Sequence, residues 1–197
     1  MNYRMIVHIL GKIVLVEGFL LLLPFAVSLI YADGCSIVFG ALAASLVLVS
    51  ALVTARAPKN RVIYASESFV IVGLAWVLTS VLGALPFTLS GSIPSFIDAF
   101  FETVSGFTTT GASILTNVEI LPMSILFWRS FTHWIGGMGV LVFVMAIIPL
   151  AGGHSMHLMR AEVPGPTVGK LVSRFQSNAK ILYGIYIGIS VLQIILL

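Results

Sequence analysis

Long apolar segments separated by short polar connections dominate the pattern of this chain. A helix needs about 20 apolar residues to cross a bilayer. We predict membrane-spanning helices over residues 6–30, 37–53, 69–85, 123–150 and 181–197. Pro86 is expected to stop the third helix, because proline has no amide hydrogen for the helical ladder. The sequence ends inside the fifth segment, so we expect a fragment of a longer protein.

Composition supports a membrane protein with several spans. The 197 residues are 59% hydrophobic and only 9% charged, whereas soluble domains carry roughly 25% charged residues. The mean hydropathy is +1.12. We attribute the net charge of +3 to basic loops, not to nucleic-acid binding. Cys35 is the only cysteine, which excludes an internal disulfide.

Lysine and arginine alternate between the connections and set an orientation. Basic residues lie near the amino terminus, after the second span and after the fourth, whereas the other connections carry acidic residues. We therefore predict a cytoplasmic amino terminus, with residues 55–66 and 151–180 also inside. The turn at Asp33 and residues 86–122 are expected outside. The chain would be a multi-pass protein of the inner or plasma membrane.

A short helix is predicted before the fourth span. Ser95 and Asp98 form a start that resembles a capping box, Glu102 lies within the helix, and Gly106 is expected to break it. Such a helix is about 15 Å long, roughly half the hydrocarbon thickness. Residues 86–122 are therefore expected to dip into the membrane and return. The fold class is an all-α membrane protein with a re-entrant pore helix and a filter loop.

The turn after this helix contains the candidate ion ligands Thr108, Thr109, Thr110, Gly111 and Ala112. Irregular backbone at membrane depth is tolerated only where protein buries it or water lines it. Carbonyl oxygens in such a loop can replace the hydration shell of a cation. We expect the backbone oxygens of Thr109, Thr110 and Gly111 to bind potassium, with Gly111 adopting a positive φ. An ordinary Ser/Thr-rich outer loop is the alternative.

Three segments carry a resemblance to a known family. Residues 101–113 (FETVSGFTTTGAS) resemble the first pore loop of the Trk/Ktr/HKT potassium transporters, and residues 128–140 (WRSFTHWIGGMGV) resemble the helix that follows it. Residues 157–166 (HLMRAEVPGP) are similar to the next cytoplasmic segment in the TrkH branch. The resemblance covers most of the chain.

The resemblance implies four helix–pore-loop–helix repeats around one pore, of which this chain holds one filter strand. Residues 1–56 would be an extra helix pair, 57–152 the first repeat, 153–180 a cytoplasmic linker and 181–197 the start of the second repeat. It also implies potassium as the transported ion, a homodimer in membrane lipid, and a cytoplasmic nucleotide-binding regulatory subunit that contacts the basic loop 160–180. We expect no organic cofactor and no nucleic-acid partner.

Glycines and charges in the spans have structural and functional interpretations. We expect Gly136, Gly137 and Gly139 to allow close helix packing, with a hinge as the alternative. Gly184 and Gly188 are expected to form a second packing face.

Arg129 is predicted to form a structural ion pair with Glu102 or Glu119; direct contact with permeating ions is the alternative.

Lys12 and Glu17 are not expected on one helical face. We predict that their polar groups are satisfied at the membrane interface or between helices, with a proton relay as the alternative. His154 and His157 lack a third metal ligand nearby.

We find no catalytic constellation, so an enzyme is not expected. The predicted function is channel-like potassium uptake. The alternatives are a single-filter subunit of a tetrameric cation channel, a non-transporting membrane scaffold and an intramembrane enzyme.

Overall fold

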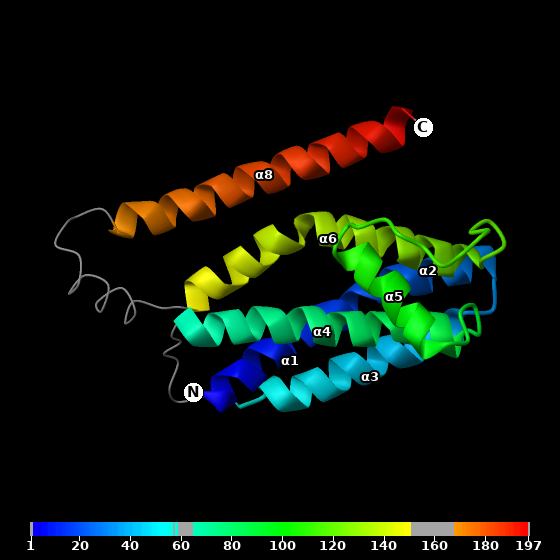
Figure 1. The fold of residues 1–197 in the computed structure, drawn as a ribbon, viewed down its shortest axis with the longest axis horizontal. Helices are drawn as coiled ribbons and strands as arrows, with labels where there is room; N and C mark the ends of the chain where they lie inside the picture. The colour runs from blue at the N-terminus through cyan, green and yellow to red at the C-terminus, as the bar shows by residue number, and fades with distance from the viewer. Residues whose placement is uncertain (1, 57, 59–64, 151–167, 197) are drawn as a thin grey trace.

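The computed structural model describes residues 2–56, 58, 65–150 and 168–196, and within these residues it contains helices and no strands. Figure 1 shows long helices running side by side, with the short helix α5 lying obliquely against one end of α4 and α6. The helices are α1 (Tyr3–Leu20), α2 (Leu22–Tyr31), α3 (Ser36–Thr54), α4 (Ala65–Leu89), α5 (Phe96–Phe107), α6 (Met123–Leu150) and α8 (Val168–Leu196).

The first predicted span is present as two consecutive helices. α1 ends at Leu20 and α2 begins at Leu22. Pro24 has no amide hydrogen to donate to the carbonyl of Leu20, four residues earlier, so the helical ladder loses a bond where α1 ends. Within the described residues, Tyr3–Tyr31, Ser36–Thr54 and Val70–Leu89 are long and apolar enough to cross a membrane.

Small residues let α1 approach α3 closely. A Cβ added at Gly11 would lie 2.9 Å from Cγ2 of Thr54, and one added at Gly18 would lie 3.0 Å from Cγ2 of Val47. Membrane helices use such positions to bring their backbones together. The two helices therefore form a tight antiparallel pair.

The prediction that Pro86 stops the third span is wrong, because α4 continues through this residue to Leu89. Pro86 is fully buried. The Thr88 hydroxyl donates to the carbonyl of Leu85 at 3.1 Å, and the Ser90 amide donates to the carbonyl of Pro86 at 3.1 Å. Side-chain hydroxyls and packed neighbours make proline tolerable inside membrane helices.

The main core lies where α3, α4 and α6 pack around the junction between α1 and α2. Its fully buried side chains come from α3, α4 and α6 and from the junction between α1 and α2; the largest are Trp128, Phe39, Phe87, Leu21 and Ile125. The Trp128 indole donates to the carbonyl of Gly83 at 2.9 Å. This bond fixes α6 against α4 just beside α5.

The last helix is longer than its apolar segment, since α8 begins at Val168 and not at residue 181. Hydropathy identifies only the apolar part of a helix, and a helix can continue into polar sequence beyond it. The α8 helix contacts α6 through Tyr186, whose hydroxyl donates to the carbonyl of Trp134 at 3.2 Å. The Trp134 indole donates to the Ser190 hydroxyl at 3.0 Å.

Candidate ion-binding site

The short helix α5 begins where the sequence predicts. Ser95 is its N-cap, and its hydroxyl accepts a hydrogen bond from the amide of Asp98 at 3.4 Å. Asp98 adds negative charge to the first turn, which favours the positive end of the helix dipole. Gly106 does not break the helix, which continues to Phe107.

A left-handed cap closes the carboxyl end of α5. Thr109 has a φ of 56°. Its amide donates to the carbonyl of Gly106 and the Thr110 amide donates to the carbonyl of Ser105, both at 2.9 Å. Glycine is the usual residue at such a cap, and a left-handed backbone costs other residues about 1–2 kcal/mol. Sequence reasoning missed this cap because a threonine carries no local signal for it.

Three carbonyls in the bend lack protein donors. The Thr108 carbonyl accepts from the Thr109 hydroxyl at 2.7 Å, and the Ala112 carbonyl accepts from the Ser105 hydroxyl at 2.6 Å. Within the described part of the chain, no group donates to the carbonyls of Thr109, Thr110 and Gly111. All three residues are exposed. The bend therefore presents consecutive backbone oxygens free to meet a ligand.

Gly111 has the positive φ that the sequence predicts, at 76°. A Cβ at Gly111 would have no neighbour within 4 Å in the described part of the chain. The need for glycine here is therefore conformational and not a matter of space. Thr109 and Gly111 both have positive φ, whereas Thr108 has φ −83°, so the bend is not a simple extended strand.

A buried carboxylate holds the bend from behind. Glu102 is 1% exposed, and its carboxylate accepts from the Ser113 hydroxyl at 3.0 and 3.1 Å and from the Ile114 amide at 3.2 Å. The Arg129 Nε donates to the same carboxylate at 2.6 Å. The predicted Glu102–Arg129 pair is present, and it links α5, the segment after the bend, and α6.

Close backbone contact joins the end of α5 to α6. A Cβ at Gly136 would overlap the carbonyl oxygen of Phe107, and one at Gly106 would overlap the Thr132 hydroxyl. Gly137 lies against Tyr186, and a Cβ at Gly139 would lie 3.1 Å from Trp76. The glycines of α6 therefore lie where three other helices approach it. By contrast, a Cβ at Gly184 or Gly188 would meet no atom of the described chain within 4 Å.

The turn at Asp33 caps the amino end of α6. The Asp33 carboxylate accepts from the Ser28 hydroxyl at 2.5 Å, from the Cys35 amide at 3.1 Å and from the Ser124 amide at 2.8 Å. Partial burial raises the pKa of Asp33, but the hydrogen bonds from Ser28, Ser124 and Cys35 outweigh it and hold the pKa below its ordinary value. Sequence reasoning missed this contact between distant residues.

No group of three or more His, Cys, Asp and Glu residues that could hold a metal ion occurs among the described residues. His154 and His157 lie outside them. The candidate cation ligands are therefore the backbone oxygens of the bend.

A half-length helix, a bend with free carbonyls and a following long helix define a helical membrane protein with a pore-loop unit. The family model for TrkH, described as a cation transport protein, matches residues 36–197. The chain belongs to this TrkH cation transport protein family.

Individual relatives agree with this family. The chain is 40% identical over 194 residues to the Trk system potassium uptake protein TrkH of Salmonella typhimurium, covering 97% of this chain and 40% of that protein. It is 32% identical over 188 residues to the Trk system potassium uptake protein TrkG of Escherichia coli, covering 94% and 39%. The crystal structure of the potassium transporter TrkH from Vibrio parahaemolyticus matches with a TM-score of 0.75 and 32% identity, over 97% of this chain and 38% of that one. The chain thus spans about 40% of the length of these relatives.

Proposed function

We propose that this protein takes up potassium ions across a membrane and that residues 108–112 supply one strand of its selectivity filter. The observation that carries the proposal is the set of free carbonyls at Thr109, Thr110 and Gly111 after a half-length helix. The names of the relatives, which include potassium uptake proteins, support the choice of ion.

The chemistry is replacement of water by carbonyl oxygens. A potassium ion loses its hydration shell, and the free carbonyls of the bend supply oxygens in its place. The carboxyl end of α5 adds partial negative charge near the ion. The membrane potential then contributes about 2.3 kcal/mol per elementary charge for each 100 mV. In this mechanism no covalent bond forms or breaks, so the proposed protein is a transporter and not an enzyme.

The pair behind the bend supports the same proposal. Arg129 is a fixed cation close to the filter strand, and a free cation there would repel potassium. Glu102 is bonded to it at 2.6 Å, so the pair is neutral overall. Because the Glu102 carboxylate also binds Ser113 and Ile114, it can hold the carbonyls in position while ions pass.

The remaining organisation is part of the proposal. Residues 1–56 would be an extra helix pair, 57–152 the first repeat, 153–180 a linker, and 181–197 part of the second repeat, in a multi-pass plasma-membrane protein. We also infer a homodimer surrounded by membrane lipid and a cytoplasmic regulatory subunit that binds nucleotide. The term "Trk system" in the names of relatives supports an assembly of several components. Residues 151–167, where we expected part of the regulatory contact, lie outside the described residues.

A glycine pair tests the proposal directly. Gly111→Ala should strain the filter strand, and the matched variant Gly91→Ala should place equal strain elsewhere. Gly91 has φ 74° and Gly111 has φ 76°, and a Cβ at either residue would meet no atom of the described residues within 4 Å. In cells that lack potassium uptake, we expect Gly111→Ala in the complete gene product to lower rubidium uptake about tenfold, as a cost of 1–2 kcal/mol implies.

Gly91→Ala should retain uptake near the unmodified level. Equal uptake by the two variants would refute the filter assignment and favour the non-transporting scaffold. Crosslinking of the complete gene product provides the second test. Four copies around one pore would favour the single-filter channel subunit over the four-repeat transporter.

A further inference from the structure

Glu17 is a buried acid without a hydrogen-bond partner in the part of the chain that the structure describes. It lies on α1, is 4% exposed, and among the described residues neither of its carboxylate oxygens has a hydrogen-bond partner. Burying an unpaired carboxylate is expensive, and ionisable residues inside membrane proteins commonly mark functional sites. A ligand that supplies a positive charge would offset this cost.

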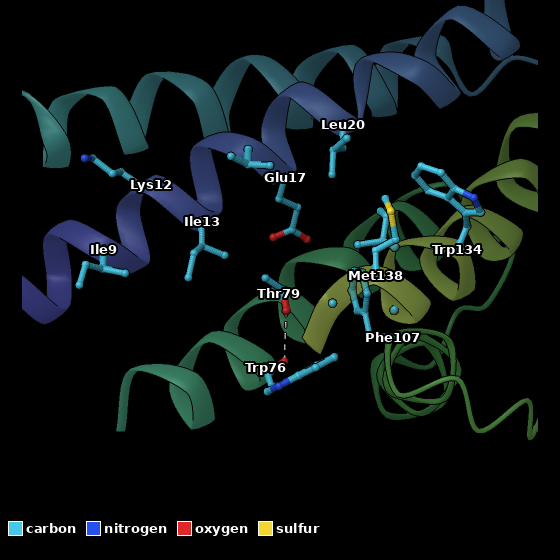
Figure 2. Close-up of a pocket in the computed structure, with 14 residues that line it drawn as sticks. Ile9, Lys12, Ile13, Glu17, Leu20, Trp76, Thr79, Phe107, Trp134 and Met138 are labelled. Atoms are coloured by element: carbon cyan, nitrogen blue, oxygen red, sulfur yellow. Dashed lines mark hydrogen bonds between the residues drawn. The ribbon is translucent and has the colours of Figure 1, made fainter. Parts of the chain in front are cut away.

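The Glu17 side chain reaches a cavity of about 380 Å³ between α1, α4, α5 and α6. Figure 2 shows Glu17 pointing from α1 toward α4 and α6, with Ile13 and Leu20 beside it and Met138 across the space. Trp76, Trp134 and Phe107 line other parts of the wall. The cavity wall is therefore apolar and aromatic, and the buried carboxylate oxygens of Glu17 lie directly behind it.

Among the described residues, no side chain forms an ion pair with this carboxylate. Lys12 lines the same cavity, but it is exposed, and Figure 2 shows its ammonium group directed away from Glu17. On α4, the Thr79 hydroxyl donates to the carbonyl of Ala75 at 2.8 Å. Gly83 lies next to Glu17, since a Cβ there would be 3.5 Å from Oε1. Neither α4 residue supplies a positive charge.

The chemistry of the wall selects the kind of ligand. A bare metal ion requires several oxygen ligands, and the described wall offers little beyond one carboxylate. A cavity of this size accommodates a compact organic molecule. Aromatic faces attract an organic cation, and apolar walls bind its hydrocarbon part. We propose that this cavity binds a small apolar ammonium compound, with the Glu17 carboxylate as its counter-ion.

The proposed cavity site is separate from the potassium ligands, and its test does not depend on potassium transport. The probe is adamantylamine, a compact hydrocarbon cage with one ammonium group, and adamantanol is the uncharged control. Binding is measured by isothermal titration to the complete gene product in lipid nanodiscs, with empty nanodiscs subtracted. We expect saturable binding of the amine, at least about tenfold tighter than binding of the alcohol.

Three variants separate charge from volume. Glu17→Gln, which is nearly isosteric, should weaken amine binding at least about tenfold and leave alcohol binding unchanged. Glu119→Gln removes the same charge from an exposed residue and should change neither. Ile13→Phe adds bulk to the wall and should weaken the binding of both compounds.

Each remaining outcome has a defined meaning. Equal affinity for amine and alcohol, or no effect of Glu17→Gln, would overturn the proposal and indicate an apolar occupant such as a lipid chain. Absence of saturable binding would overturn it as well. If Glu17→Gln does not fold, the unmodified protein decides: a tenfold preference for the amine that Ile13→Phe reduces supports the site, and any other result rejects it.

Discussion

Glu102 links three parts of the candidate site, namely α5, the segment after the bend and α6. It contacts the residues that follow the bend and pairs with Arg129 on α6. Glu102→Gln should destabilise the protein by roughly 3 kcal/mol, because removing one partner of a buried pair leaves the other charge uncompensated. Unfolding of the purified protein in detergent, followed by circular dichroism, measures this change.

Glu119→Gln is the control for Glu102, since it changes the same chemical group at an exposed position. Its effect should stay within about 0.5 kcal/mol. Equal stability of the two variants would show that the buried pair contributes nothing. An Arg129→Gln protein that folds normally and carries a sharply higher potassium flux would instead assign Arg129 a direct role with ions.

Asp33 makes a pH-dependent contribution to stability. Its pKa is below the ordinary value, so its stabilising effect is fully present above about pH 4, the usual Asp pKa, and is lost as pH falls through the lower folded value. Asp33→Asn should cost about 1 kcal/mol at pH 7, a typical value for a lost cap. The variant should also show a smaller loss of stability than the unmodified protein between pH 5 and pH 2.

Thermal unfolding across this pH range measures the contribution of Asp33. Asp98→Asn is a suitable comparison, because Asp98 is exposed and lies in the first turn of α5, whereas Asp33 caps α6 from the turn between α2 and α3. Parallel pH profiles for Asp33→Asn and the unmodified protein would contradict the assignment.

Gly136 of α6 is one of the glycines that let α5 and α6 pack closely. Gly136→Ala should lower stability by about 1–3 kcal/mol, because its methyl group would overlap the backbone oxygen of Phe107 and the core would be overpacked. Gly184→Ala is the matched control. A Cβ at Gly184 would have no neighbour within 4 Å among the described residues, so the better helix propensity of alanine should leave stability equal or slightly higher. Thermal melting compares the stability of the two variants. Equal melting temperatures for Gly136→Ala and Gly184→Ala would refute close packing at Gly136.

Periodicity and composition identify the helices because a helix that crosses a membrane needs an apolar segment of known length. Residues 123–150 match α6 in full, and Ser95 caps α5 as a local pattern predicts. The course of α4 through Pro86 could not be predicted, since it depends on neighbours that bury the proline. The left-handed Thr109 has no local signal either.

Contacts between distant residues limit what the sequence reveals of the site. The Glu102–Arg129 pair was predictable because few acids were available to match one arginine in an apolar segment. The Asp33–Ser124 bond joins residues 91 positions apart, and nothing in either segment indicates the other. The orientation of Glu17 toward a cavity likewise depends on how α1, α4 and α6 assemble.

The described helices place the predicted outer segments at one end of the bundle. Asp33 binds the amino end of α6, and Figure 1 shows α5 at this same end, with the end of α3 and the start of α4 at the other. The basic residues of the loop between α3 and α4 predict a cytoplasmic position for that other end. With this predicted orientation, the carboxyl end of α5, which carries partial negative charge, would point from the outer side toward the membrane centre, where it would favour a cation.

Cysteine labelling tests this orientation. Cys35 is buried, and replacing it with serine gives a background in which Asn117→Cys or Arg56→Cys is the one reactive thiol of this chain; both positions are exposed. A membrane-impermeant thiol reagent added to intact cells should label Asn117→Cys, and it should label Arg56→Cys only after permeabilisation. Labelling of Arg56→Cys or Lys59→Cys from outside would reverse the topology. The negative end of α5 would then point outward, away from the membrane centre, and the electrostatic argument for a cation at the bend would fail.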